Sequence, residues 1–175
     1  LKENVMSGSG DFCLKHKEGW DEKEKFNAVK DDPENRQQNI SEPFEIESYT
    51  KFTFPGRGEK YSDFKWNFQC FSGVDYAEGQ DKGIFQIIND HGDGWDEMIA
   101  GEKGNYDYLM YNDIEHRNPF VREELNTWGQ WYHDQIHFAG VRLDAVKHQS
   151  PEFYQEWLYA LRATTGENIF AVGAY

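Results

Sequence analysis

Cysteine is scarce in this sequence, and the shortage bears on metal binding and on compartment. Among 175 residues only Cys13 and Cys70 are cysteines, and they lie far apart without the spacing of metal ligands. We therefore expect two unpaired thiols in a reducing compartment rather than a cysteine metal site.

Long apolar runs are also missing. No segment approaches the about 20 apolar residues of a membrane-spanning helix. Residues 1–6 lack the apolar core of a signal peptide. We expect no membrane partner and slightly favour a cytoplasmic over a secreted protein. The first residue is not Met, which is compatible with a piece of a longer chain.

Positive charge is the third shortage. The chain has 18 Lys and Arg against 32 Asp and Glu, a formal net charge of -14. A field of that sign argues against nucleic acid and anionic membranes as partners. The acidity indicates either a solubilising surface or sites for cations. Aromatic residues, by contrast, make up 17% of the chain, which suits sugar binding but also simple core filling.

Residues 118–175 show an alternation of predicted helices and strands. Both helices start at a capping residue followed by proline, Asn118-Pro119 and Ser150-Pro151. Gly166 is expected to end the second helix. Their inward faces are predicted from apolar residues at helical spacing: Val121, Leu125, Trp128, Tyr132 and Ile136, then Phe153, Tyr154, Trp157, Leu158 and Leu161.

Two apolar stretches, residues 138–146 and 169–173, are predicted as buried strands. Because the second helix joins them, they should be parallel with a right-handed crossover. Arg142 and Asp144 stand at the C-terminal end of the first strand, where active sites of parallel α/β folds are built. An internal ion pair between these two residues is the structural alternative.

Residues 17–117 have a different character, with glycine-rich turns, aromatic runs and many charges. Partial alternation over residues 49–54 and 64–71 predicts short antiparallel strands between long loops. Residues 17–45 are polar without a sustained apolar period, and we expect them to be loosely ordered.

The chain resembles the alpha-amylase family, in particular its bacterial liquefying-type and cytoplasmic-type members, in four stretches. Residues 141–148 (VRLDAVKH) are similar to the signature at the end of the fourth barrel strand. Residues 11–16 (DFCLKH) are similar to the third-strand motif. Residues 54–66 resemble the protruding B domain, and residues 104–113 resemble the stretch where that domain returns to the barrel.

This resemblance implies an α/β fold, namely a partial (β/α)8 TIM barrel with an irregular antiparallel β-rich B-domain insertion. Residues 1–16 would hold the third barrel strand and residues 17–117 the B-domain-like insertion. Residues 118–175 would hold the third helix, the fourth strand and helix, and the fifth strand. Since three strands cannot close a barrel, we expect apolar edges to be exposed and covered by association.

The resemblance also implies the chemistry of a retaining glycosidase, which needs a nucleophile and an acid/base. Asp144 matches the nucleophile, and Arg142 would orient it and keep it ionised. Ala174 stands where the family has its acid/base glutamate. Because alanine has no proton to give and most of the barrel has no counterpart in this sequence, we expect an inactive or severely impaired chain. A natural loss of the glutamate and an engineered replacement both account for this alanine.

Substrate and metal contacts follow from the same resemblance. His16, Lys147 and His148 match residues that line the sugar cleft. The alternative is a structural histidine for His16 and a solvated polar loop for Lys147 and His148. The family's calcium ligands are matched by Asp107, Asp113, the carbonyl of His148 and, in a second cluster, Asp96 and Glu115.

Three departures weaken that calcium expectation. Lys15, Ser72 and Arg117 replace ligand positions of the family pattern. Calcium takes 6–8 oxygen ligands, so fewer ligands and added positive charge should make the conserved site weak or empty.

Two functions therefore remain. The first is a retaining endo-hydrolase segment acting on α-1,4-glucans such as starch, glycogen and maltodextrins. The second is a non-catalytic glucan-binding or structural remnant of an amylase. A nucleic-acid module is disfavoured by the negative charge.

Overall fold

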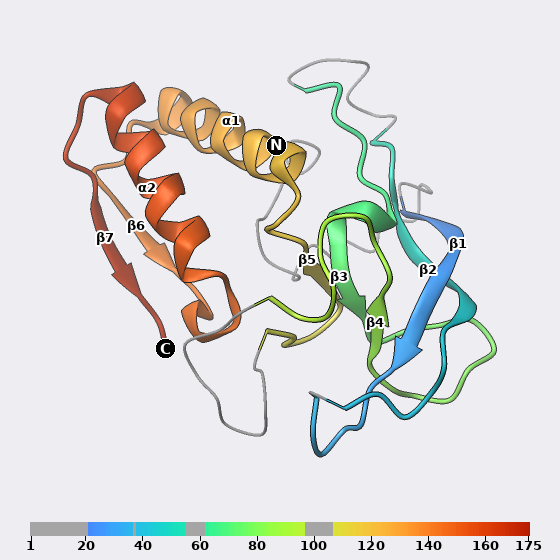
Figure 1. The fold of residues 1–175 in the computed structure, drawn as a ribbon. Helices are drawn as coiled ribbons and strands as arrows, with labels where there is room; N and C mark the ends of the chain where they lie inside the picture. The colour runs from blue at the N-terminus through green and yellow to red at the C-terminus, as the bar shows by residue number, and fades with distance from the viewer. Residues whose placement is uncertain (1–20, 37, 55–61, 97–106) are drawn as a thin grey trace.

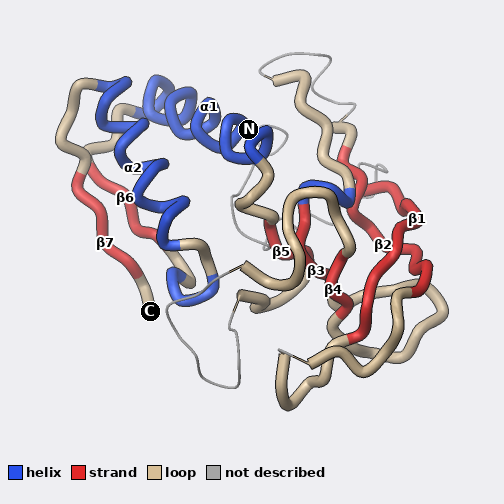
Figure 2. Tube along the Cα trace, in the orientation of Figure 1, coloured by secondary structure: helices blue, strands red, loops and turns tan. Residues whose placement is uncertain are grey.

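The computed structural model describes residues 21–36, 38–54, 62–96 and 107–175. Its elements in chain order are β1 (Asp21–Lys30), β2 (Phe44–Phe52), the 3-10 helix η3 (Phe68–Cys70), β3 (Phe71–Val74), β4 (Phe85–Ile87), β5 (Asn112–Ile114), α1 (Pro119–Ile136), β6 (Gly140–Leu143), the 3-10 helix η4 (Val146–His148), α2 (Pro151–Thr165) and β7 (Phe170–Gly173). The first five strands lie together on one side, and both α-helices lie with β6 and β7 on the other (Figure 1). Figure 2 shows the same division by type of element.

The N-terminal part is a five-stranded antiparallel sheet in the order β2-β1-β4-β3-β5. Its β-rich, antiparallel character confirms the prediction for this region. The loose order expected for residues 17–45 is wrong where the structure describes them, because β1 forms a long hairpin with β2. One face of β1 buries Phe26 and Ala28. The opposite face carries charges that pair across strands, such as Lys25 with Glu45 at 3.1 Å.

The strand predicted over residues 64–71 is also wrong. Only Trp66 bridges to Phe52, and a 3-10 turn follows at η3. The side chain of Asn67 accepts a hydrogen bond from the Gln69 amide at 2.9 Å, which caps this turn and ends the extended run. Local capping by asparagine competes with strand pairing in this way.

Both helix starts are confirmed. The Asn118 side chain accepts from the Phe120 amide, and the Ser150 side chain accepts from the Phe153 amide. Gly166, in the left-handed conformation with φ of 69°, ends α2 as expected.

Helices α1 and α2 pack closely at Gly129. A Cβ at this position would lie 2.8 Å from the ring of Trp157, whose Nε1 donates to the Leu125 carbonyl at 3.0 Å. This contact turns α1 so that Gly129 and His133 are buried in its second half. The predicted inward stripe is therefore wrong at its end, where Tyr132 and Ile136 are exposed.

The strands β6 and β7 are parallel, with Gly140 opposite Phe170 and Leu143 opposite Gly173, as their connection through α2 predicts. Their predicted burial is wrong. One face packs against the core through Val141 and Leu143, but Phe170 is 68% exposed on the other. A single helical layer covers this pair in the described chain, so alternation along the strands leaves every second side chain uncovered.

One hydrophobic core joins the two parts, since buried residues of the antiparallel sheet and of both helices belong to a single cluster. His116 links them, with its ring 4.3 Å from that of Phe153. Of the predicted barrel strands, the third (residues 1–16) lies outside the described residues. No helix among the described residues is both long and apolar enough to cross a membrane.

Candidate active site

The strand end predicted as an active site brings Arg142 and Asp144 together. Residues two apart on a strand point to the same face, and Arg142 Nη2 lies 3.0 Å from Asp144 Oδ1. The two side chains are 66% and 64% exposed. The pair therefore lies open to solvent at the C-terminal end of β6 rather than in the interior.

Ala174 lies next to this pair on the neighbouring strand. Its amide donates to the Leu143 carbonyl at 2.8 Å, and its carbonyl accepts from the Val146 amide at 3.1 Å. These bonds continue the β6–β7 register by one step past Leu143 and Gly173. Position 174 is thus the strand neighbour of Asp144, and in a parallel pair their side chains leave the same face.

Lys147 and His148 follow on η4, which turns away from the strand through Ala145 in the left-handed conformation with φ of 51°. The amide of His148 donates to the Ala145 carbonyl at 2.8 Å. The Lys147 ammonium lies 5.3 Å from the ring centroid of Tyr175. His16 lies outside the described residues.

Sequence reasoning missed two residues that support this strand end. The hydroxyl of Tyr154, assigned only to a helix stripe, donates to the Asp144 carbonyl at 3.3 Å. Burial, and then the neighbouring Asp144, raise the pKa of Tyr154 to about 12. Gly173 is the second, because a Cβ there would lie 3.1 Å from the side chain of Val146. Nothing local in the sequence marks either contact.

The predicted metal ligands Asp107 and Asp113 are both buried. Asp107 accepts from the Asp96 amide at 2.7 Å, and Asp113 accepts from the Ser72 hydroxyl at 2.5 Å. Burial raises the pKa of both carboxyls, and the negative charges nearby, including Asp107 acting on Asp113, raise them further.

The guanidinium of Arg117 is hydrogen-bonded to the neighbouring carboxylate, that of Glu115. It makes two 2.7 Å contacts with Glu115, from Nε to Oε1 and from Nη2 to Oε2. Asn89 donates to the same carboxylate at 2.9 Å. Burial alone would raise the pKa of Glu115, but the hydrogen bonds from Arg117 and Asn89 outweigh it and lower this pKa.

These contacts do not fit a full calcium shell. Across residues 21–36, 38–54, 62–96 and 107–175, no group of three or more His, Cys, Asp or Glu side chains is arranged to hold a metal ion. Calcium takes 6–8 oxygen ligands. The Glu115 carboxylate is already paired with the Arg117 guanidinium, which leaves fewer oxygens for a cation.

Known proteins give a consistent comparison. The chain is 41% identical over 177 residues to glucan 1,4-alpha-maltohexaosidase of Bacillus sp. (strain 707), covering 100% of this chain and 34% of that protein. It is 41% identical to cytoplasmic alpha-amylase of Escherichia coli (strain K12), covering 100% of this chain and 36% of the relative. Alpha-amylase of Bacillus licheniformis is 42% identical over 166 residues, 95% of this chain and 32% of that protein.

No protein-family model matches the chain. The chain spans about a third of the length of the curated relatives that it matches. The aligned region nevertheless extends over the whole of this sequence, so the strand end with Arg142 and Asp144 lies within it. Over its full length the chain therefore belongs to the alpha-amylase family.

Proposed function

We propose that this chain carries the nucleophile half of an alpha-amylase active site, from a retaining endo-hydrolase of α-1,4-glucans such as starch, glycogen and maltodextrins. Asp144 is the nucleophile, and Arg142 positions it through their ion pair. The observation that carries this proposal is the Arg142–Asp144 pair, 3.0 Å apart at the C-terminal end of β6, in a chain 41% identical to named amylases.

The acid/base half is missing. Neighbouring strands lie about 4.8 Å apart, and a retaining glycosidase needs its two carboxyl groups about 5–5.5 Å apart. A glutamate at position 174 has the right starting point, since Ala174 is hydrogen-bonded to Leu143 directly beside Asp144. Alanine donates no proton to a leaving oxygen, so we infer that the chain as given does not hydrolyse glucans.

Three further residues complete the proposal for the cleft. Lys147 and His148 follow the nucleophile directly on η4 and would contact sugar on one side of the cut bond. His16, in the third-strand motif, would contact sugar beside the scissile bond. Calcium binding at Asp107, Asp113, Asp96 and the His148 carbonyl is proposed to be weak or lost, because the Arg117 guanidinium lies against Glu115 and adds positive charge.

The open face of β6 and β7 supports association. Phe170 is 68% and Val172 49% exposed, both on the face that carries Arg142. We propose that association with another apolar surface covers this face. A cytoplasmic location fits the buried, unpaired thiol of Cys70, whose pKa burial raises to about 11.

A maltotriosyl fluoride tests the nucleophile directly. Fluoride leaves without protonation, so loss of the acid spares the first step, while loss of the base slows hydrolysis of the glycosyl-enzyme. The chain as given should gain the mass of one maltotriosyl group, mapped by peptide mass spectrometry to Asp144. Asp144→Asn is the matched control and should gain none. Absence of an adduct on the unchanged chain contradicts the proposal.

The same samples address the second candidate, a glucan-binding remnant, which Ala174 favours. Maltoheptaose binding by calorimetry without any adduct would support that remnant. Neither binding nor adduct would contradict both functions.

A further inference from the structure

The carboxylate of Asp144 depends on its main chain for its position. The side chain is 64% exposed, and the Arg142 side chain that pairs with it is exposed as well. A reacting group is held precisely only where surrounding contacts restrain it, and packing restrains an exposed side chain little. What fixes the main chain at the end of β6 therefore matters for this carboxylate.

The main chain after Asp144 takes an unfavourable turn. Ala145 adopts the left-handed conformation, with φ of 51° and ψ of 37°, which is costly for a residue with a Cβ. Such a conformation persists where the surrounding structure over-determines it. On one side of the turn, the Leu143 carbonyl accepts from the Ala174 amide at 2.8 Å. On the other side, the Ala145 carbonyl accepts from the His148 amide, also at 2.8 Å.

Tyr154 supplies a contact between these two. Its hydroxyl donates to the carbonyl of Asp144 at 3.3 Å, and this carbonyl belongs to the peptide that joins Asp144 to Ala145. A side chain of α2 thus restrains the peptide with which the left-handed turn begins. The contact is longer than a typical hydroxyl hydrogen bond, so we expect a moderate effect from its loss.

The Tyr154 side chain is itself held in place. The Tyr154 amide donates to the Ser150 carbonyl at 3.2 Å in the first turn of α2. The ring packs against the hydrophobic core, with its centroid 5.6 Å from that of Phe153. Burial, and then the charge of Asp144, raise the pKa of Tyr154 to about 12. The phenol therefore keeps its proton at neutral pH and remains a donor.

We propose that Tyr154 is a positioning residue for the nucleophile, because it holds the peptide after Asp144 from the first turn of α2. This inference rests on the proposed function of Asp144. Tyr154 acts through the main chain, whereas Arg142 contacts the carboxylate itself. Small misplacements of a reacting group slow a reaction strongly, so a bond that adds little stability can still matter for the rate.

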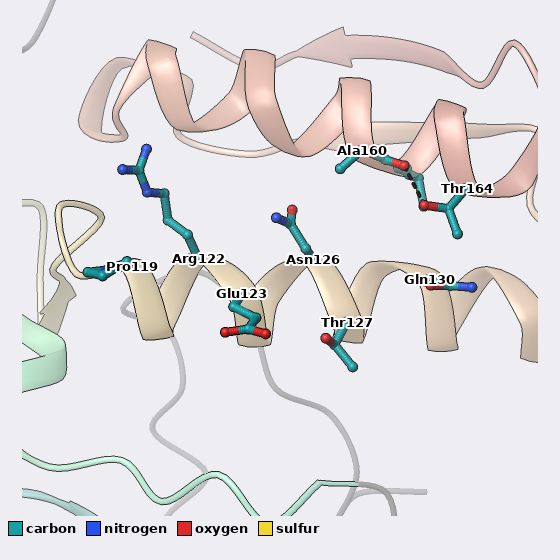
Figure 3. Close-up of a pocket in the computed structure, with 9 residues that line it drawn as sticks. Pro119, Arg122, Glu123, Asn126, Thr127, Gln130, Ala160 and Thr164 are labelled. Carbon is teal, nitrogen blue, oxygen red and sulfur yellow. Dashed lines mark hydrogen bonds between the residues drawn. The ribbon is translucent and has the colours of Figure 1, made fainter.

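The far half of α2 offers a matched control. Thr164 is ten residues beyond Tyr154, about 15 Å along the helix at about 1.5 Å per residue. Its hydroxyl donates to the Ala160 carbonyl at 2.7 Å, beside the pocket between α1 and α2 (Figure 3). Tyr154→Phe and Thr164→Val thus each remove one hydroxyl that donates to a carbonyl, and the first does so at the strand end.

The rate at which maltotriosyl fluoride forms an adduct on Asp144 tests the inference. Tyr154→Phe should lower the rate at saturating maltotriosyl fluoride about threefold to tenfold, the range of one neutral hydrogen bond. The half-saturating concentration should stay unchanged, and the carbonyl carbon signal of Asp144 should shift in NMR spectra. Thr164→Val should alter neither rate nor signal, and both variants should have a similar Tm. Tyr154→Leu, which also lacks the hydroxyl, repeats the test if Tyr154→Phe fails to fold.

The outcomes separate this inference from the function on which it rests. An adduct that forms equally fast in the unchanged chain and in Tyr154→Phe overturns the inference alone, as does an equal slowing in Thr164→Val. An unmoved carbonyl signal of Asp144 has the same meaning. No adduct on the unchanged chain overturns both the proposed function and the role of Tyr154.

Discussion

The amide of Ala174 donates a hydrogen bond to the carbonyl of Leu143 at 2.8 Å, and the register that this bond continues makes position 174 the strand neighbour of Asp144. The proposed loss of activity therefore concerns one missing carboxyl group beside a retained one. The backbone that would hold both groups is in place.

Replacing Arg142 should impair chemistry without affecting the fold. Exposed ion pairs contribute at most about 1 kcal/mol to stability, and both partners here are about two-thirds exposed. Arg142→Gln should change Tm little but slow adduct formation on Asp144 about tenfold or more, because a charge-assisted contact is lost. A large drop in Tm with an unchanged adduct rate would show a structural role instead.

Gly129 should resist even a methyl group. Gly129→Ala places a Cβ 2.8 Å from the Trp157 ring, and overpacking costs about 1–3 kcal/mol. The gain in helix propensity is about 1 kcal/mol, so we expect net destabilisation in urea unfolding. Gln135→Ala, on an exposed position of the same helix, should be neutral or stabilising. Equal stability of both variants would contradict this packing.

Asn118 should connect the two parts of the fold. Its Oδ1 caps α1 at the Phe120 amide, and its Nδ2 donates to the Gln69 carbonyl at 3.0 Å. Asn118→Ala should cost about 2 kcal/mol, the sum of a cap and a buried hydrogen bond. Asn118→Ser keeps a capping oxygen but loses the amide donor to Gln69 without burying a charge, so its unfolding free energy should lie between those of the unchanged chain and of Asn118→Ala. Identical values for Ser and Ala would contradict a role for the cap.

Acid should destabilise the chain through His116. Burial, the first cause, lowers the pKa of His116 to about 4. The unfolded imidazole takes up a proton near pH 6.5, before the folded one does, so stability present above pH 6.5 is lost as pH falls toward 4. His116→Leu should flatten this part of the curve of unfolding free energy against pH by up to about 3 kcal/mol. A variant curve parallel to the original would contradict the assignment.

Calcium should stabilise the chain little. A ligand present at its own Kd adds only about 0.4 kcal/mol, so about 1 mM calcium should barely move Tm if binding is weak. Arg117→Asp should increase the calcium-dependent shift, because it removes the guanidinium and adds carboxylate oxygens. A large shift in the unchanged chain would contradict weak binding.

Local signals account for what the sequence predicts well. The caps at Asn118 and Ser150 act within a few residues, so the helix starts can be predicted from the sequence alone. The pairing of Arg142 with Asp144 needs only strand alternation over two residues. Parallel pairing of β6 and β7 follows from the helix that joins them.

Predictions fail where distant residues decide. Whether Phe170 is covered depends on layers beyond its own strand. In β1, only Phe26 and Ala28 mark the alternation of buried and exposed side chains, so the sequence gives a weak signal for this strand. The contacts of Tyr154 with Asp144 and of Lys147 with Tyr175 arise from tertiary folding and have no local signature.

Release of reducing ends from soluble starch by the chain as given and by Ala174→Glu tests the central claim most directly, with Ala174→Gln and the double variant Asp144→Asn/Ala174→Glu as controls. A positioned general acid contributes about 10²–10⁴-fold. The account predicts no release by the unchanged chain or either control, and measurable release by Ala174→Glu. Release by the unchanged chain, or a silent Ala174→Glu variant that folds normally, would contradict it.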